Sequence, residues 1–128
     1  MFRPYSHDNG LQPWEYLAAA AGTYKSGQAL QVTNGQLAPV TEALKTTPAY
    51  ICMADVTVEA GAELPVTRVT DKVVFETTLS AAAASAKVGS LLEVSAGGLA
   101  VDATVAGTFD VNYIEGTEAG SVVRGRFK

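Results

Sequence analysis

Apolar and polar residues alternate with a period of two along much of the chain, the pattern of β-strands that bury one face. In QALQVTNGQLAPV, residues 28–40, Leu30 and Val32 alternate with their neighbours, and Asn34-Gly35 tolerates the positive φ angles of a tight turn. Segments rich in β-branched and aromatic residues predict further strands at 49–54, 64–69, 72–79, 109–114 and 121–127. Short strands separated by turn residues predict an all-β barrel or sandwich.

The sequence of this predicted hairpin occurs twice in the chain. GQALQVTNGQLA at 27–38 and GSLLEVSAGGLA at 89–100 are identical at six of twelve positions. The match extends in both directions, with gaps, and gives repeat units of roughly 15–69 and 77–127 joined by 71–76. A solenoid needs about three repeats, so two units are better explained as halves of one small barrel or sandwich. Residues 15–128 are therefore expected to form a single β-rich domain.

Two alanine runs interrupt this pattern, at 18–21 and 81–84. Alanine has the highest helix propensity, and Ser80 is suited to an N-cap, so one or two helical turns are predicted at 80–87. The first run leads at once into Gly22, Thr23 and Tyr24, which are typical of extended structure. Small side chains would equally let a neighbouring backbone or subunit approach closely, and both interpretations stay open.

Residues 1–14 lie outside the repeat and contain prolines among polar and aromatic residues. Such a segment cannot bury enough surface to order itself, so we expect an N-terminal arm that is either a mobile tail or docks on a partner. Trp14 and Tyr16, at its junction with the first unit, form an aromatic cluster with Tyr24 that would anchor the core or an interface.

Arg124 and Arg126 lie two apart on the last predicted strand and should project from the same face. A solvated strand face explains them, and so does pairing with an acidic neighbouring subunit. The candidate partner-binding residues are thus Arg3, Pro4, Tyr5, Trp14, Tyr16, Arg124 and Arg126.

The composition limits the classes of partner that the protein is expected to bind. The 128 residues are 48% hydrophobic and 17% charged, with a net charge of −4. A surface this poor in charge often meets another protein, and the scattered lysines and arginines supply no basic stripe for nucleic acid. No run of about 20 apolar residues is present, so we expect no membrane span, and the N-terminal residues lack the apolar core of a signal peptide.

The residues of common active sites are nearly missing. His7 is the only histidine and lies in the expected arm, and Cys52, the only cysteine, lies in the apolar run AYICMAD, typical of a buried thiol. The acidic residues fall in turn-like segments, and no glycine-rich phosphate loop or dinucleotide fingerprint occurs. We therefore expect no enzyme, no catalytic or metal-binding residue and no cofactor.

From about Trp14 onward, the order of YLAAAAGTYKSGQALQVTNGQLAPV, TPAYICMAD, AGAELPVTRV, ETTLSAAAASAKVGSLLEV and IEGTEAGSVVRGRF resembles head-stabilising capsid decoration proteins of tailed bacteriophages and prophages. The resemblance implies a small β-rich protein, often a homo-oligomer such as a trimer, that is made in the bacterial cytoplasm. It also implies binding to the assembled major capsid protein on the virion surface through an N-terminal arm. The alternatives are another phage structural component, such as a head-fibre base or tail protein, and a β-barrel that binds a small molecule or carbohydrate.

Overall fold

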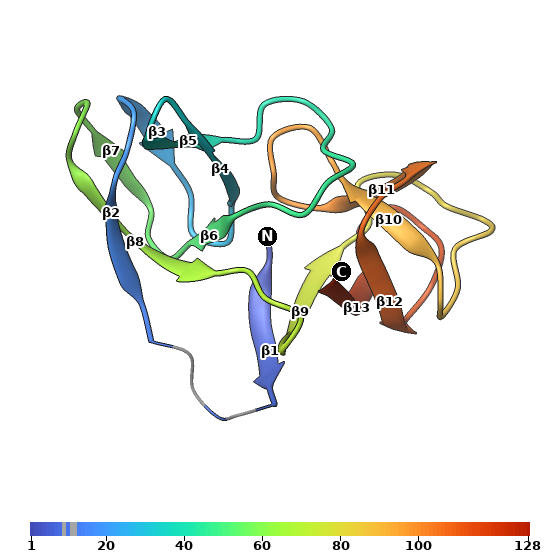
Figure 1. Ribbon diagram of the computed structural model, residues 1–128. Helices are drawn as coiled ribbons and strands as arrows, with labels where there is room; N and C mark the ends of the chain where they lie inside the picture. Colours follow the sequence, from blue (N-terminus) through green and yellow to red (C-terminus); the bar gives the residue numbers. More distant parts are fainter. Residues whose placement is uncertain (9, 11–12) are drawn as a thin grey trace.

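The structure is a computed structural model that describes residues 1–8, 10 and 13–128 (Figure 1). The all-β class predicted from the sequence is confirmed, because the elements of the described residues are β-strands in antiparallel sheets. The helical turns predicted at 80–87 are wrong. Backbone N–H groups there form long-range hydrogen bonds instead. The Ser80 N–H donates to Val101 O at 2.9 Å, and the Ala83 N–H donates to Thr117 O at 2.8 Å.

The first half of the chain forms a five-stranded sheet with the order β2-β8-β6-β4-β5. Its strands are β2 (Glu15–Ala18), β4 (Ala29–Thr33), β5 (Gln36–Pro39), β6 (Tyr50–Cys52) and β8 (Glu63–Arg68). A separate two-stranded sheet pairs β3 (Gly22–Tyr24) with β7 (Val56–Val58).

The second half forms a six-stranded sheet with the order β1-β9-β13-β12-β10-β11. Its strands are β1 (Arg3–His7), β9 (Val73–Thr78), β10 (Leu91–Val94), β11 (Val101–Ala106), β12 (Phe109–Ile114) and β13 (Val122–Phe127). Without β1, the order of this sheet repeats that of the first sheet, strand for strand, in chain order.

Matching hydrogen bonds support this correspondence of the two halves. The Gln28 N–H donates to Lys25 O at 3.1 Å, and the Ser90 N–H, 62 residues later, donates to Lys87 O at 2.9 Å. In each sheet an isolated parallel bridge also connects the two ends of the repeated strand order. Ala19, which follows β2, pairs with Leu37 on β5, and Leu79, which follows β9, pairs with Val101 on β11. Ala19 thus corresponds to Leu79, so the two alanine runs do not occupy equivalent places.

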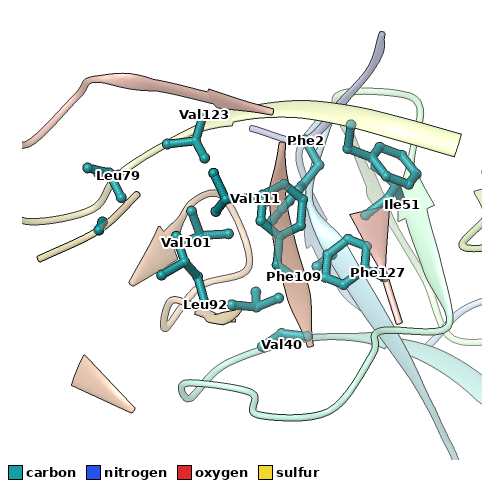
Figure 2. Packing of buried hydrophobic residues seen from close by; sticks show 14 of the residues in the cluster. Phe2, Val40, Ile51, Leu79, Leu92, Val101, Phe109, Val111, Val123 and Phe127 are labelled. Carbon is teal, nitrogen blue, oxygen red and sulfur yellow. The ribbon is translucent and has the colours of Figure 1, made fainter. Parts of the chain in front are cut away.

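The core has two parts. One combines residues of the five-stranded sheet with residues of the β3–β7 pair and includes Tyr24, whose hydroxyl donates to Ala20 O at 2.7 Å. The other fills the second sheet and the junction between the halves, where Ile51 joins the buried rings of Phe109 and Phe127 (Figure 2). These two rings are 5.1 Å apart between centroids and meet edge to face, a favourable aromatic geometry.

The N-terminal segment differs from the arm expected at 1–14. Residues 3–7 form β1, which pairs with β9, and Phe2 is 1% exposed with its ring centroid 5.9 Å from that of Phe109 and 5.6 Å from that of Phe127. The N-terminus lies between the two sheets (Figure 1). Burial of one phenyl ring stabilises this docking by about 2–3 kcal/mol. The expected arm also included residues 9, 11 and 12, which lie outside the described residues.

The two halves also contact each other through their backbones. The Ala29 N–H donates to Gly98 O at 2.7 Å, and Leu44 and Val94 exchange two N–H···O bonds of 2.8 and 2.9 Å. At Gly98 the φ angle is +74°, and a Cβ atom would lie 2.9 Å from Ala29 O. Glycine is therefore required here both by the left-handed backbone and by the close approach of the first half.

Candidate binding surface

One carboxylate organises the outer face of the six-stranded sheet. Glu76 on β9 lies opposite Arg3 on β1 and opposite Arg124 on β13. It accepts hydrogen bonds from both guanidinium groups, with Arg124 Nε at 2.8 Å. The Glu76 side chain is only 12% exposed, whereas that of Arg3 is 66% exposed. Two positive charges therefore share one largely buried negative charge.

Arg124 is held between two tyrosine rings. Its guanidinium carbon lies 4.0 Å from the ring centroid of Tyr5 on β1 and 4.5 Å from that of Tyr113 on β12. Both rings remain partly exposed. Stacking on aromatic rings suits a planar, weakly hydrated guanidinium and fixes its orientation. The result is a platform of alternating aromatic and cationic groups from β1, β13 and β12, with Glu76 of β9 beneath it.

Arg126, two residues further along β13, binds a different carboxylate. Its Nη2 lies 2.9 Å from Asp8 Oδ1, and its Nη1 donates to Asp71 O at 2.9 Å. Hydrogen bonding to Arg126 lowers the pKa of Asp8 below its ordinary value. Arg124 and Arg126 thus pair with acidic groups of their own chain.

An apolar hollow of about 370 Å³ lies beside this platform. Consecutive residues of β1 form one wall, so the edge of that strand borders the hollow. Trp14, which precedes β2 and is 52% exposed, forms part of the lining together with groups from both halves of the chain. The lining residues are Pro4, Tyr5, Ser6, His7, Gly10, Trp14, Met53, Thr67 and Val73.

Most of the residues predicted as partner-binding meet here. Pro4, Tyr5 and Trp14 line the hollow, while Arg3 and Arg124 share Glu76 beside it. Arg126 lies on the same sheet and binds Asp8. Tyr16 is exposed on β2 opposite Pro65 and does not line the hollow. The predicted aromatic cluster separates likewise, because Tyr24 is buried in the first core.

Sequence reasoning missed Glu76, Tyr113 and Met53. A signal for Glu76 existed, because it is the only charged residue in VVFETT, residues 73–78, where it alternates with Val73 and Phe75. A charge on the outer face of an otherwise apolar strand marks a paired or functional position. Tyr113 and Met53 carried no such signal, since they reach the site only through the strand pairing.

Cys52 and His7, the residue types most often used in catalysis, do not lie together in one site. Cys52 is buried on β6, its thiol lies 3.2 Å from Ala54 O, and burial raises its pKa, which favours the unreactive thiol form. His7 is on β1. Within the described ranges, no group of three or more His, Cys, Asp or Glu side chains could hold a metal ion. Those ranges also contain no helix long and apolar enough to cross a bilayer.

No protein-family model matches the chain, and no curated protein matches it.

Proposed function

We propose that this chain is a non-catalytic structural protein of a tailed-phage head that binds the assembled major capsid protein and stabilises the lattice. The sequence resemblance motivates this proposal. The observation that supports it best is the convergence of exposed tyrosine, tryptophan and arginine side chains around one apolar hollow. These three residue types dominate the energetics of protein–protein interfaces.

The charge distribution agrees with a protein partner. The chain as a whole is acidic, yet its four arginines, at positions 3, 68, 124 and 126, all lie on β1, β8 or β13. Three carboxylates, those of Glu15, Glu76 and Asp8, pair with these four guanidinium groups, so one positive charge is left in excess. A local excess of arginine on an acidic molecule orients an approaching partner and discourages other contacts. Binding would stabilise the lattice by mass action, since each bound copy favours the capsid state to which it binds best.

Cosedimentation with capsids assembled from purified major capsid protein tests this function. We expect the full chain to pellet with expanded capsids at a fixed stoichiometry and to raise their melting temperature. A protein that stays in the supernatant over its whole soluble concentration range would refute the proposal. Size-exclusion chromatography with light scattering of the free protein measures whether it is the homo-oligomer that the resemblance implies.

The hollow also supports a second candidate, a small-molecule or carbohydrate site. Tyr5 and Trp14 offer aromatic surfaces, Ser6, His7 and Thr67 offer polar groups, and the volume lies within the range of ligand pockets. Titration with a panel of monosaccharides and oligosaccharides, monitored by the fluorescence of Trp14, tests this candidate. An unchanged spectrum at millimolar sugar would exclude it.

A further inference from the structure

We infer that the hollow beside β1 receives an extended segment of a partner protein in which a large apolar or aromatic side chain is followed closely by a carboxylate. This inference rests on the proposed function only in taking the partner to be a protein. It specifies the chemistry of the segment from the lining of the hollow and from the charges next to it.

The lining selects an apolar side chain. Pro4, Trp14, Met53 and Val73 contribute apolar groups to the walls. Burial of an aromatic side chain against such surface contributes about 25 cal/mol for each Å² removed from water. Ser6, His7 and Thr67 offer polar groups, but most of the lining is apolar, so it favours an apolar side chain over the many hydroxyls of a sugar.

The walls that β1, β8 and β9 contribute are preformed, because these strands are paired within their sheets, whereas Gly10, Trp14 and Met53 line the hollow from outside the strands. Thr67 on β8 and Val73 on β9 are buried, and Tyr5 is fixed by its contact with Arg124. Little ordering of the site is needed when a ligand enters, so a small contact area can still give measurable affinity.

The neighbouring charges select a carboxylate. Arg3 and Arg124 share the single negative charge of Glu76, and Arg3 remains largely exposed. Tyr5 belongs to both features, since it lines the hollow and stacks on Arg124. A carboxylate next to the buried side chain would therefore supply the second negative charge for two guanidinium groups that share the carboxylate of Glu76.

Side chains, rather than a continuous backbone ladder, must carry this recognition. β1 is the outer strand of its sheet, but Pro4 lacks an N–H group and the pairing with β9 shifts register between Pro4 and Ser6. A proline and a bulge are the devices by which edge strands resist addition of another strand. The site is therefore expected to tolerate changes of the backbone in the bound segment better than changes of its two side chains.

Blocked pentapeptides without tryptophan test the inference with the full chain. The first peptide carries phenylalanine and glutamate separated by one residue, so that both side chains project from the same side of an extended chain. Glutamine replaces glutamate in the second peptide, and alanine replaces phenylalanine in the third. Trp14 is the only tryptophan, so its fluorescence reports occupancy of the hollow directly.

We expect the first peptide to bind most tightly. Loss of the phenyl ring should weaken binding by more than tenfold, as for a central interface residue. Loss of the carboxylate should weaken it by up to about fivefold, the range for an exposed ion pair, and this difference should vanish in Arg3→Gln and shrink with salt. Equal binding of the first and third peptides, or no change of Trp14 fluorescence with any peptide, would overturn the inference.

Variants in capsid cosedimentation separate this inference from the proposed function. Trp14→Ala and Tyr5→Ala should reduce capsid binding, whereas Val88→Ser, at an exposed apolar position outside the hollow, should not. Unchanged capsid binding by both aromatic variants would refute the role of the hollow and leave capsid binding intact. Peptide binding by a chain that never pellets with capsids would support the inference while refuting the phage-head function.

Discussion

The junction between the two halves makes Gly98 the most informative position for a stability measurement. A Cβ at Gly98 would lie 2.9 Å from Ala29 O and 3.2 Å from Ala29 N, both backbone atoms that cannot move aside alone. Gly97, in the same turn, has a similar φ angle of +88° with no atom within 4 Å of its Cβ position. Gly97→Ala is therefore a matched control that carries the backbone strain without the clash.

The expected magnitude follows from these contacts. Both substitutions place alanine in the left-handed region at about 1–2 kcal/mol, partly offset by about 0.4–1 kcal/mol from the stiffer unfolded chain. Gly98→Ala must also displace Ala29, which is fully buried, and break its 2.7 Å N–H···O bond to Gly98. An unsatisfied buried donor costs about 1–3 kcal/mol. Gly98→Ala should therefore be less stable than Gly97→Ala by about 1–3 kcal/mol.

Urea unfolding followed by circular dichroism measures this difference. The two variants should show similar slopes and clearly separated midpoints, because the change lies in the native state. Equal midpoints would refute the reasoning, since they would mean that the halves are not pressed together at Gly98. A second transition, seen only in Gly98→Ala, would show instead that the two halves unfold separately.

Three further results are expected. Phe2→Ala should lower the free energy of unfolding by about 3–5 kcal/mol, because it removes a buried ring that packs against Phe109 and Phe127. Val32→Ala, at an exposed position, should change it by under about 1 kcal/mol, and equal effects of the two variants in urea unfolding would refute the docking of the N-terminus. Cys52 should resist alkylation at pH 8 in the native protein and react after unfolding in urea, so rapid labelling of the folded chain, measured by mass spectrometry, would contradict its burial. Because the pKa of Asp8 is lowered in the folded state, its ionised carboxylate stabilises the fold at pH values above the ordinary carboxyl pKa of about 4. This stabilisation is lost as the pH falls through the lowered pKa, so the unfolding free energies of wild type and Asp8→Asn should converge between about pH 5 and pH 2.

The all-β class was predicted from local signals, namely β-branched residues, turn residues and alternation with a period of two. Burial alternates along β13, whereas β4, β6 and β11 do not alternate and were marked by the other signals or not at all. The sequence did not predict the place of the N-terminal segment. Phe2 lies in a short stretch with no strong hydrophobic pattern, and its burial depends on a surface formed by Phe109 and Phe127 together, which only the assembled fold creates. The helix at 80–87 failed for a similar reason, since tertiary hydrogen bonds outweighed the propensity of alanine.

The platform beside the hollow lies where the duplicated halves differ. In the ladders of the two sheets, the pair Glu76 and Arg124 occupies the place that Tyr16 and Pro65 occupy in the first half. The second sheet alone gains β1, which brings Arg3 to Glu76 along with the ring that stacks on Arg124. Features common to both halves, such as the strand order and the turn glycines, serve the fold. A feature confined to one half is free to serve binding.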